Sequence, residues 1–307
     1  MINSPLMQRI LTLLFIGAVV FMGWEAYGLY RSIFPNMAIL SRAYPIVVYR
    51  GPDKPFRVEL KRNRPTHWVS LNDISKQART AVILSEDAAF YQHHGYDPDA
   101  IKEALKHDLE KRSFARGAST LTQQVVKNVF LEHEKRLWRK LKEFILAVRL
   151  EKAVGKARIL EVYFNIAEWG EGVFGIQAAA RFYFNKPASE LNAKEGAFLA
   201  MLLPSPKRYS QSFRQKQLTP YAYRTIQNIL GKMAAVGAIT DEERQTLADR
   251  PLAFEVKPPA EGTEEDDEAE TSPATPANGV DNEDPDEPET DISSEFDSKV
   301  DPGPRNR

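Results

Sequence analysis

Two carboxylates and two histidines lie close together in the sequence after an apolar run. Glu86 and Asp87 follow the apolar residues 81–84, and His93 and His94 come shortly afterwards. A carboxylate at the end of an apolar helix is partly withdrawn from water, which raises its pKa and makes it a candidate general base. Taken alone, the segment also fits an ordinary solvated helix C-terminus. It therefore indicates acid–base chemistry without establishing it.

A second polar segment is suited to binding an anion. Residues 117–120 read Gly-Ala-Ser-Thr and precede a helical pattern in which Thr120 and Gln123 fit a capping box. The free N–H groups at a helix N-terminus, together with nearby hydroxyls, attract groups such as phosphate. Thr120, Gln124 and Lys127 lie near one helix face, so a polar stripe would run from the anion site. The plain alternative is a well-capped surface helix.

Basic residues open the next helical pattern, at 135–143. We expect Lys135, Arg139 and Lys142 on one side of this helix, and Arg139 can pair with Glu143 one turn later. A dense basic cluster beside an anion-binding helix end favours a polyphosphate ligand. One alternative is an exposed basic face. Another is a surface that binds nucleic acid, although no recognised nucleic-acid-binding pattern accompanies the cluster. The apolar side, which we expect to face the core, is formed by Leu137, Leu141, Phe144 and Val148.

The composition limits the class of protein. The chain has 307 residues, 43% of them apolar and 27% charged, which suffices for a sizeable core and excludes a wholly disordered or fibrous protein. Cysteine is absent, so thiol nucleophiles, disulfides and zinc–cysteine sites are excluded. The net charge of −1 combines a basic body, residues 1–256, with an acidic segment, residues 257–307. The basic body predicts an anionic partner such as phosphate, nucleic acid or a membrane surface.

Helices are the elements that must position these side chains. The pattern from about 72 to 249 is helical, and a Pro-punctuated stretch before it holds two short β-like runs, 46–49 and 56–60. From 257 onward, Pro, Glu, Asp, Ser and Thr dominate, and such a segment buries too little apolar surface to fold. We expect helices at 73–90, 98–112, 120–131, 134–153, 156–166, 173–183, 193–203, 220–236 and 240–248.

Residues 10–30 are predicted to span a membrane. The stretch carries one charge, Glu25, and about 20 helical residues cover the roughly 30 Å core of a bilayer. Glu25 would lie near one interface beside Trp24, Tyr27 and Tyr30, which suit an aromatic belt. No small-residue cleavage site follows, so we expect an uncleaved anchor with the N-terminus inside. A buried core helix is the alternative.

Together, these segments resemble the motifs of the peptidoglycan glycosyltransferases (glycosyltransferase family 51), the enzymes that polymerise lipid II. Residues 165–170 look like the monofunctional biosynthetic transglycosylases of Gram-negative bacteria, and the acidic segment holds no SxxK motif of a transpeptidase. In the late motif, Gly196 stands where Ala is usual. Five segments match in the family's order: 86–95 (EDxxFxxHxG), 117–128 (GxSTxTQQxxKN), 139–143 (RKxxE), 156–165 (KxxILExYxN) and 195–204 (EAAxLAxxLP).

The resemblance implies a mostly α, lysozyme-like glycosyltransferase domain behind a single N-terminal transmembrane helix. It places the protein in the bacterial inner membrane as a single-pass protein with a periplasmic catalytic domain. The expected partners are lipid II, the lipid-linked glycan chain, the membrane and other cell-wall synthesis proteins, and no nucleic acid. The expected parts are a cytoplasmic N-terminus, 1–9, the transmembrane helix, 10–30, a connector with short strands, 31–64, the catalytic domain, 65–250, and a disordered acidic tail, 251–307.

The resemblance also implies an inverting reaction and assigns roles to residues. Glu86 would be the base for the attacking hydroxyl, and Glu143 the second essential carboxylate, acting either by orienting Arg139 or Lys140 or directly on the diphosphate. A divalent metal, Mg²⁺ or Mn²⁺, is an expected cofactor. Basic residues would stabilise the diphosphate leaving group. The residues implied to bind substrate are Asp87, Phe90, His93, Gly117, Ser119, Thr120, Gln123, Gln124, Lys127, Asn128, Lys135, Arg139 and Lys140.

Three other functions fit parts of this pattern. A muramidase or lytic transglycosylase shares the implied fold, but it protonates a sugar leaving group and needs no polybasic cluster. A non-catalytic scaffold of the cell-wall machinery would be signalled by loss of Glu86 or Glu143, and both are present. A membrane-bound nucleic-acid binder is disfavoured by the carboxylates inside the basic region.

Overall fold

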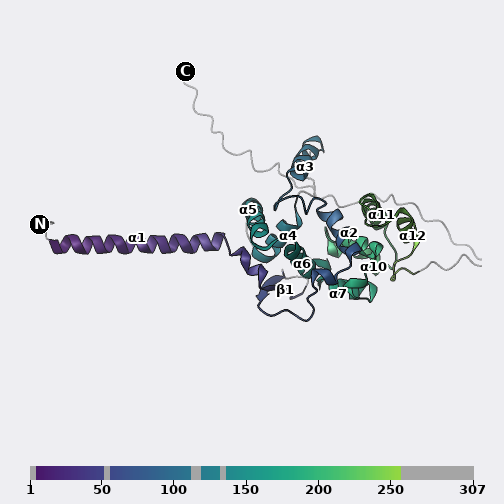
Figure 1. Ribbon diagram of the computed structural model, residues 1–307, viewed down its shortest axis with the longest axis horizontal. Helices are drawn as coiled ribbons and strands as arrows, with labels where there is room; N and C mark the ends of the chain where they lie inside the picture. Colours follow the sequence, from purple (N-terminus) through teal and green to yellow (C-terminus); the bar gives the residue numbers. More distant parts are fainter. Residues whose placement is uncertain (1–4, 52–55, 112–118, 132–135, 257–307) are drawn as a thin grey trace, which may run out of the picture. The chain divides into compact units, whose positions relative to one another are not determined.

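The computed structural model describes residues 5–51, 56–111, 119–131 and 136–256. The chain divides into two units, Met1–Pro258 and Pro259–Arg307. The second unit, which makes up most of the predicted acidic tail, lies outside the described residues. The described part is mostly helical, as the sequence pattern predicts, with two small antiparallel sheets (Figure 1).

The helices and strands follow one another along the chain with short connections. The two sheets are hairpins: β1, Tyr44–Val48, pairs with β2, Arg57–Lys61, and β3, Glu168–Gly170, pairs with β4, Val173–Phe174. Short 3₁₀ turns are η1, Met37–Ser41, η2, Leu71–Asp73, and η3, Ala188–Glu190. The helices are α1, Pro5–Ile33, α2, Lys76–Glu86, α3, Pro98–Lys111, α4, Leu121–Phe130, α5, Arg136–Val154, α6, Lys156–Ile166, α7, Ile176–Phe184, α8, Ala193–Leu202, α9, Pro206–Tyr209, α10, Gln211–Arg214, α11, Pro220–Ala235, and α12, Asp241–Asp249.

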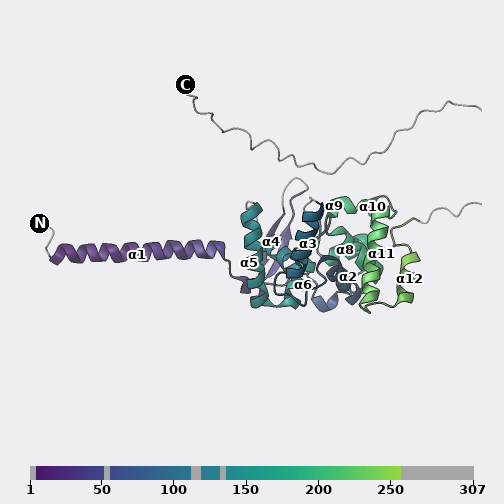
Figure 2. The same ribbon diagram turned by 90° about the horizontal axis from the view of Figure 1, so that it is seen from above.

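Helix α8 forms the centre of the core. Every residue of α8 is buried, and the helix packs against α2 and α11 (Figure 2). A Cβ atom on Gly196 would lie 2.6 Å from the Cα atom of Ala78, so the backbones of α8 and α2 approach too closely for any side chain there. This contact explains why glycine stands at the position where alanine is usual in the motif.

The nine predicted helices are confirmed as α2 to α8, α11 and α12, with shifted ends. The first stops at Glu86 because Asp87 leaves the helical conformation, and residues 87–95 form a bent loop. The helix predicted from 173 begins at Ile176, since residues 173–174 pair as β4 and Gly175 has a φ of +84°. The short helices α9 and α10 lie outside the predicted set.

Helix α5 presents a different face to the core from the one its apolar residues predict. Leu141 is 50% exposed, whereas Lys142 and Glu143 are buried. Phe144 is half-buried and packs on the ring of Tyr96 at 4.3 Å. The prediction is therefore wrong for Leu141, since the helix turns Lys142 and Glu143 inward instead, whereas Phe144 and Val148 of the predicted face are half-buried and the side chain of Leu137 is not described. The apolar residues of the buried face are Leu146, Ala147 and Leu150.

Helix α1 contains the residues predicted to cross a membrane. Large apolar side chains along it are exposed, Phe15 to 69% and Trp24 to 74%. Among the residues that the structure describes, however, no helix combines the length and the apolar character that crossing a membrane requires. At the end of this helical segment, the Arg149 guanidinium of α5 lies 5.0 Å from the ring of Phe34 and donates to the hydroxyl of Tyr30 at 3.4 Å.

Both flanks of the predicted domain contribute to its core. Met37 and Leu40, in the segment predicted to be a connector, are buried. Leu252 and Phe254, in the segment predicted to be a disordered tail, are also buried, and the Phe254 ring packs on Phe198 at 5.1 Å. The folded domain therefore extends at both ends beyond the predicted limits of 65 and 250.

Candidate active site

Glu86 is the last residue of α2 and is held by two neighbouring helices. The Gln124 side chain of α4 donates from Nε2 to Glu86 Oε2 at 3.0 Å, and the Tyr163 hydroxyl of α6 donates to Gln124 Oε1 at 3.2 Å. Burial raises the pKa of Glu86, the nearby charge of Asp87 raises it further, and the hydrogen bond from Gln124 opposes both. A half-buried carboxyl group with a raised pKa is suited to accept a proton from a substrate.

Asp87 joins the end of α2 to the beginning of α4. Its carboxylate accepts the backbone N–H of Leu121 at 2.9 Å and lies 3.0 Å from His93 Nε2. Burial raises the pKa of Asp87, while the Leu121 N–H and His93 lower it. Because Leu121 is the first residue of α4, this contact fixes Glu86 relative to Gln124.

A buried polar network lies behind this contact. His93 Nδ1 is 3.4 Å from the ammonium of Lys156, which pairs with Glu151 at 2.6 Å. The Thr122 hydroxyl donates to the same Glu151 oxygen at 2.6 Å, and the Lys156 ammonium also lies 4.5 Å from the centre of the Phe90 ring. Phe90 is fully buried. Sequence reasoning assigned no role to Glu151 or Lys156, since only the tertiary fold brings them to the histidine.

The entrance to α4 has the predicted capping box. The Thr120 hydroxyl accepts the N–H of Gln123 at 3.2 Å, and the Gln123 side chain accepts the N–H of Thr120 at 3.0 Å. The Thr120 hydroxyl also donates to the carbonyl of Gly95 at 2.9 Å. Gly95 itself has a φ of +94° and lies against the backbone of Val148, where a Cβ atom would be only 2.6 Å away. Thr120 and Gln123 therefore shape the site from buried positions.

Lys140 connects the second and third polar segments. Its ammonium donates to the Ser119 hydroxyl at 2.6 Å and lies 3.2 Å from Glu143 Oε2. Arg139 Nε lies 3.4 Å from Glu143 Oε1, which confirms the predicted pair. Glu143 is only 4% exposed, although both cations reach solvent. Glu143 thus lies between two basic side chains, while its predicted role in orienting them stays a prediction.

A cavity of about 410 Å³ opens on the residues around Glu86. Its lining includes Glu86, Asp87, Ser119 and Thr120, so the first two motifs meet in one space. Sequence reasoning missed the other charged residues of this lining, since they come from α3, from the loop before it and from α11. They are Asp97, Asp99, Glu103 and Lys232.

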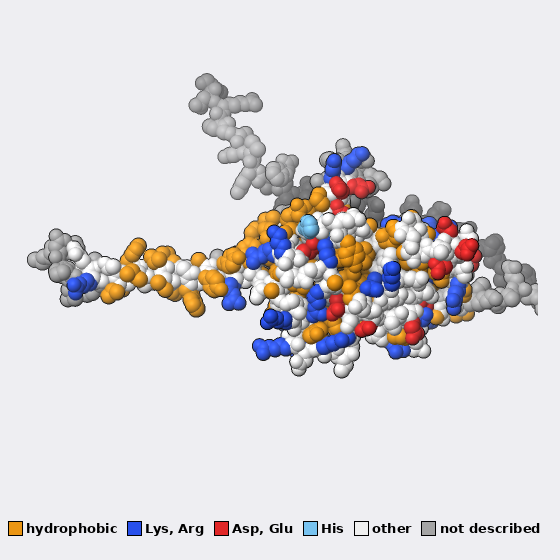
Figure 3. Space-filling model, viewed as in Figure 1, with side chains coloured by type: hydrophobic (Ala, Val, Ile, Leu, Met, Phe, Trp, Pro, Cys, Tyr) orange, Lys and Arg blue, Asp and Glu red, His pale blue; other side chains and the backbone are white. Residues whose placement is uncertain are grey.

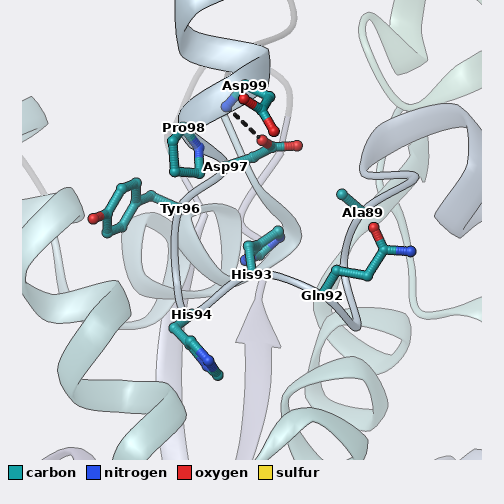
Figure 4. A pocket seen from close by; sticks show the side chains of 8 residues that line it. All are labelled: Ala89, Gln92, His93, His94, Tyr96, Asp97, Pro98 and Asp99. Atoms are coloured by element: carbon teal, nitrogen blue, oxygen red, sulfur yellow. Dashed lines mark hydrogen bonds between the residues drawn. The ribbon is translucent and has the colours of Figure 1, made fainter.

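The two histidines occupy different environments beside a second cavity, of about 290 Å³. His93 is buried, while His94 is exposed, and their imidazole rings point in different directions (Figure 4). Asp97, at the far end of this loop, accepts the N–H of Asp99 at 2.9 Å and thereby begins α3. The predicted polar cluster therefore separates into one structural histidine and one surface histidine.

The remaining predicted site residues lie elsewhere. Lys127 is exposed on α4 and Asn128 is half-buried, and neither lines the 410 Å³ cavity. Gly117 and Lys135 lie outside the described residues, so their positions stay predictions. Within the described ranges, no group of three or more His, Asp and Glu side chains is placed to hold a metal ion.

The helical domain therefore brings a desolvated glutamate and a basic cluster close together. The transglycosylase family model matches residues 54–234, and the chain belongs to this family.

Several similar proteins carry the name biosynthetic peptidoglycan transglycosylase. The one from Nitrosomonas eutropha is 50% identical over 142 residues, which cover 46% of this chain and 58% of the relative. The one from Paraburkholderia phytofirmans is 37% identical over 224 residues, 71% of this chain and 91% of the relative. Penicillin-binding protein 1F of Bacillus subtilis is 40% identical over 193 residues, 63% of this chain and 26% of that protein. The chain thus spans little more than half of the Nitrosomonas relative.

Proposed function

We propose that this protein is a peptidoglycan glycosyltransferase, which polymerises lipid II into β-1,4-linked glycan strands and releases undecaprenyl diphosphate. The observation that carries the proposal is the joint placement of Glu86 and Ser119 in one cavity, with Lys140 bonded to Ser119. These contacts support a site in which a carboxylate and a cation act on the same substrate. The family and the printed names of the relatives support the same substrate class.

Glu86 is proposed as the general base. In an inverting displacement, the 4-hydroxyl of the acceptor GlcNAc attacks the anomeric carbon of the donor, and its proton passes to the carboxylate as the bond to the diphosphate breaks. Gln124 occupies Oε2 of Glu86, and among the described residues Oε1 has no hydrogen-bond partner. Oε1 is therefore the oxygen available to the acceptor hydroxyl.

The basic residues are proposed to bind the diphosphate of the donor. A diphosphate leaves as an anion, so the leaving group needs charge stabilisation more than a proton. Arg139 and Lys140 supply that charge, and the buried Glu143 holds both in place. Lys127 and Lys135 are proposed to add to it. We also propose a divalent metal, Mg²⁺ or Mn²⁺, as a cofactor of the reaction. Loss of activity on adding a chelator tests this requirement.

We propose that the buried residues of the motifs hold other parts of the site in place and do not contact the substrate themselves. Phe90, His93 and Gln123 are buried, so their effect on the substrate passes through the loop and the helix end that they hold. Asp87 acts in the same way through the Leu121 N–H. Ser119 and Gln124 would contact the substrate directly.

Helix α1 is proposed to attach the protein to the bacterial inner membrane, with the catalytic domain in the periplasm. Its large apolar side chains are exposed along its length. On α5, Trp138, Leu141 and Ile145 are exposed as well and recur at the spacing of one helix face. Because the proposed substrates are lipid-linked, a membrane surface would hold enzyme and substrate together. Extraction of native membranes with salt, carbonate and detergent tests this attachment.

Incubation of the full chain with labelled lipid II, with and without Mg²⁺, Mn²⁺ or a chelator, tests the reaction. We expect a glycan polymer that a muramidase digests, together with released undecaprenyl diphosphate. Cleavage of existing peptidoglycan instead would indicate a lytic enzyme. Intact lipid II in the presence of folded protein would indicate a scaffold and overturn the proposal.

A further inference from the structure

A separate cavity, of about 640 Å³, lies where the N-terminal segment joins the domain. It is lined by η1 and by the end of β2 and contains none of the residues of the proposed active site. Two arginines, Arg42 and Arg62, supply its charge, and Ile39 and Leu60 supply apolar surface that is 42% and 37% exposed. The cavity therefore combines cationic and apolar walls.

The hairpin register places the two arginines next to each other. Tyr44 of β1 pairs with Lys61 of β2, so the ladder ends beside Arg42 and Arg62. Over the described residues, neither guanidinium has an ion-pair or hydrogen-bond partner. Of the other polar side chains in the lining, the Asn36 oxygen accepts the N–H of Ala38, and the Ser41 hydroxyl donates to the carbonyl of Ala38. The two guanidinium groups are thus free to bind an anion.

The position along the chain favours a lipid as the source of that anion. Asn36 follows the last residue of α1, Ile33, by three residues, so the cavity begins within about 11 Å of the helix end. Lys and Arg side chains gather over the β1–β2 hairpin beside it (Figure 3). Each planar guanidinium can donate two parallel hydrogen bonds to two oxygens of a phosphate group, and apolar walls suit the first acyl carbons.

We propose that this cavity binds the phosphate-bearing headgroup of an anionic phospholipid. The inference rests on the proposal that α1 attaches the protein to a membrane. Binding there would set the orientation of the domain on the bilayer, since the headgroup would be fixed between η1 and the hairpin. It is independent of the chemistry at Glu86.

The test is native mass spectrometry of the full chain in a neutral detergent, titrated with phosphatidylglycerol or with phosphatidylcholine of the same acyl chains. We expect one phosphatidylglycerol to bind at least about tenfold more tightly than phosphatidylcholine. Both lipids offer a phosphate that can accept charge-assisted hydrogen bonds from two arginines, but the quaternary ammonium of phosphatidylcholine is repelled by the same arginines. The double variant Arg42→Gln, Arg62→Gln is expected to lose this preference. Both side chains are exposed and unpartnered, so the fold is expected to survive, as circular dichroism would verify.

The matched control removes the same charge from the same hairpin outside the cavity. The double variant Arg50→Gln, Arg57→Gln is expected to keep the preference for phosphatidylglycerol. An equal loss in both double variants would show general attraction to a basic surface and overturn the site. Displacement of the lipid by inorganic phosphate at a similar concentration would show that the cavity binds a soluble anion, and would overturn its assignment to a phospholipid.

A separate readout distinguishes this inference from the proposed function. Polymerisation of lipid II in detergent by the Arg42→Gln, Arg62→Gln variant is expected to equal that of the unmodified protein. Failure of the unmodified protein to polymerise would count against the proposed enzyme and leave the lipid titration unaffected. Absence of any headgroup preference would overturn the assignment of the cavity and would not affect the proposed enzymatic activity.

Discussion

The two carboxylates of the proposed site, Glu86 and Glu143, lie in opposite electrostatic surroundings. Glu86 is held by the neutral amide of Gln124 and stands next to Asp87, with no cation paired to it among the described residues. Glu143 is more deeply buried but lies within 3.4 Å of both Arg139 and Lys140. The first surroundings favour taking up a proton, whereas the second place a carboxylate between two cations. The fold thus separates the proposed base from the carboxylate that is proposed to hold the cations.

The largest expected effect is on Glu86. Glu86→Gln keeps the shape and the Gln124 contact but cannot accept a proton, so turnover should fall by about 10³-fold, within the usual range for a general base. Because the site is otherwise intact, the KM for lipid II should hardly change. Steady-state polymerisation assays measure both. Glu103→Gln, on the same cavity but exposed, is the control and should stay near the normal rate.

Glu143→Gln should show a different kinetic pattern. Loss of its charge removes the ion pairs that hold Arg139 and Lys140, so kcat/KM should fall by about 10- to 100-fold. Binding of the diphosphate donor should weaken. Titration with a lipid-linked diphosphate measures this. Glu171→Gln, which removes the exposed pair with Lys207, should change nothing. A pure loss of kcat with unchanged donor binding would make Glu143 a direct participant.

Gly196→Ala tests the packing of α8 against α2, the helix that ends at Glu86. The added methyl group would meet the Ala78 backbone at 2.6 Å, so α2 must shift and the free energy of unfolding should fall by about 1–3 kcal/mol. Urea denaturation measures this change. Gly231→Ala in α11 is the matched control, because nothing lies within 4 Å of its added methyl group. That variant should be unchanged or more stable by about 0.5–1 kcal/mol.

The smallest expected effect is a displacement of the pH profile. Glu86 works as the carboxylate, and burial raises its pKa, so activity should fall as pH decreases through that raised value. Gln124→Met removes a hydrogen bond that lowers this pKa. The acidic limb of kcat/KM should therefore move to higher pH. Gln92→Met, the same substitution at an exposed position, should leave the limb in place, and an equal movement in both would exclude the assigned cause.

The sequence predicts the helices and the capping at Thr120 because these depend on neighbouring residues. It predicts the pairing of Arg139 with Glu143 for the same reason. The buried face of α5 could not be predicted, since a hydrophobic pattern assumes that charges face solvent, and here Lys142 and Glu143 face inward. The contacts of His93 with Lys156, and of Tyr163 with Gln124, join distant segments. Only the fold reveals them.

The close contact between Gly196 and Ala78 also determines how the site moves. Helix α2 rests on the wholly buried α8, so α2 cannot open without disturbing the core. Backbone amides of both helices should therefore exchange with solvent deuterium only through global unfolding, while those of exposed α12 should exchange through local opening. Glu86 would then be among the least mobile groups of the enzyme, and the substrate, rather than the base, would supply the motion that brings them together.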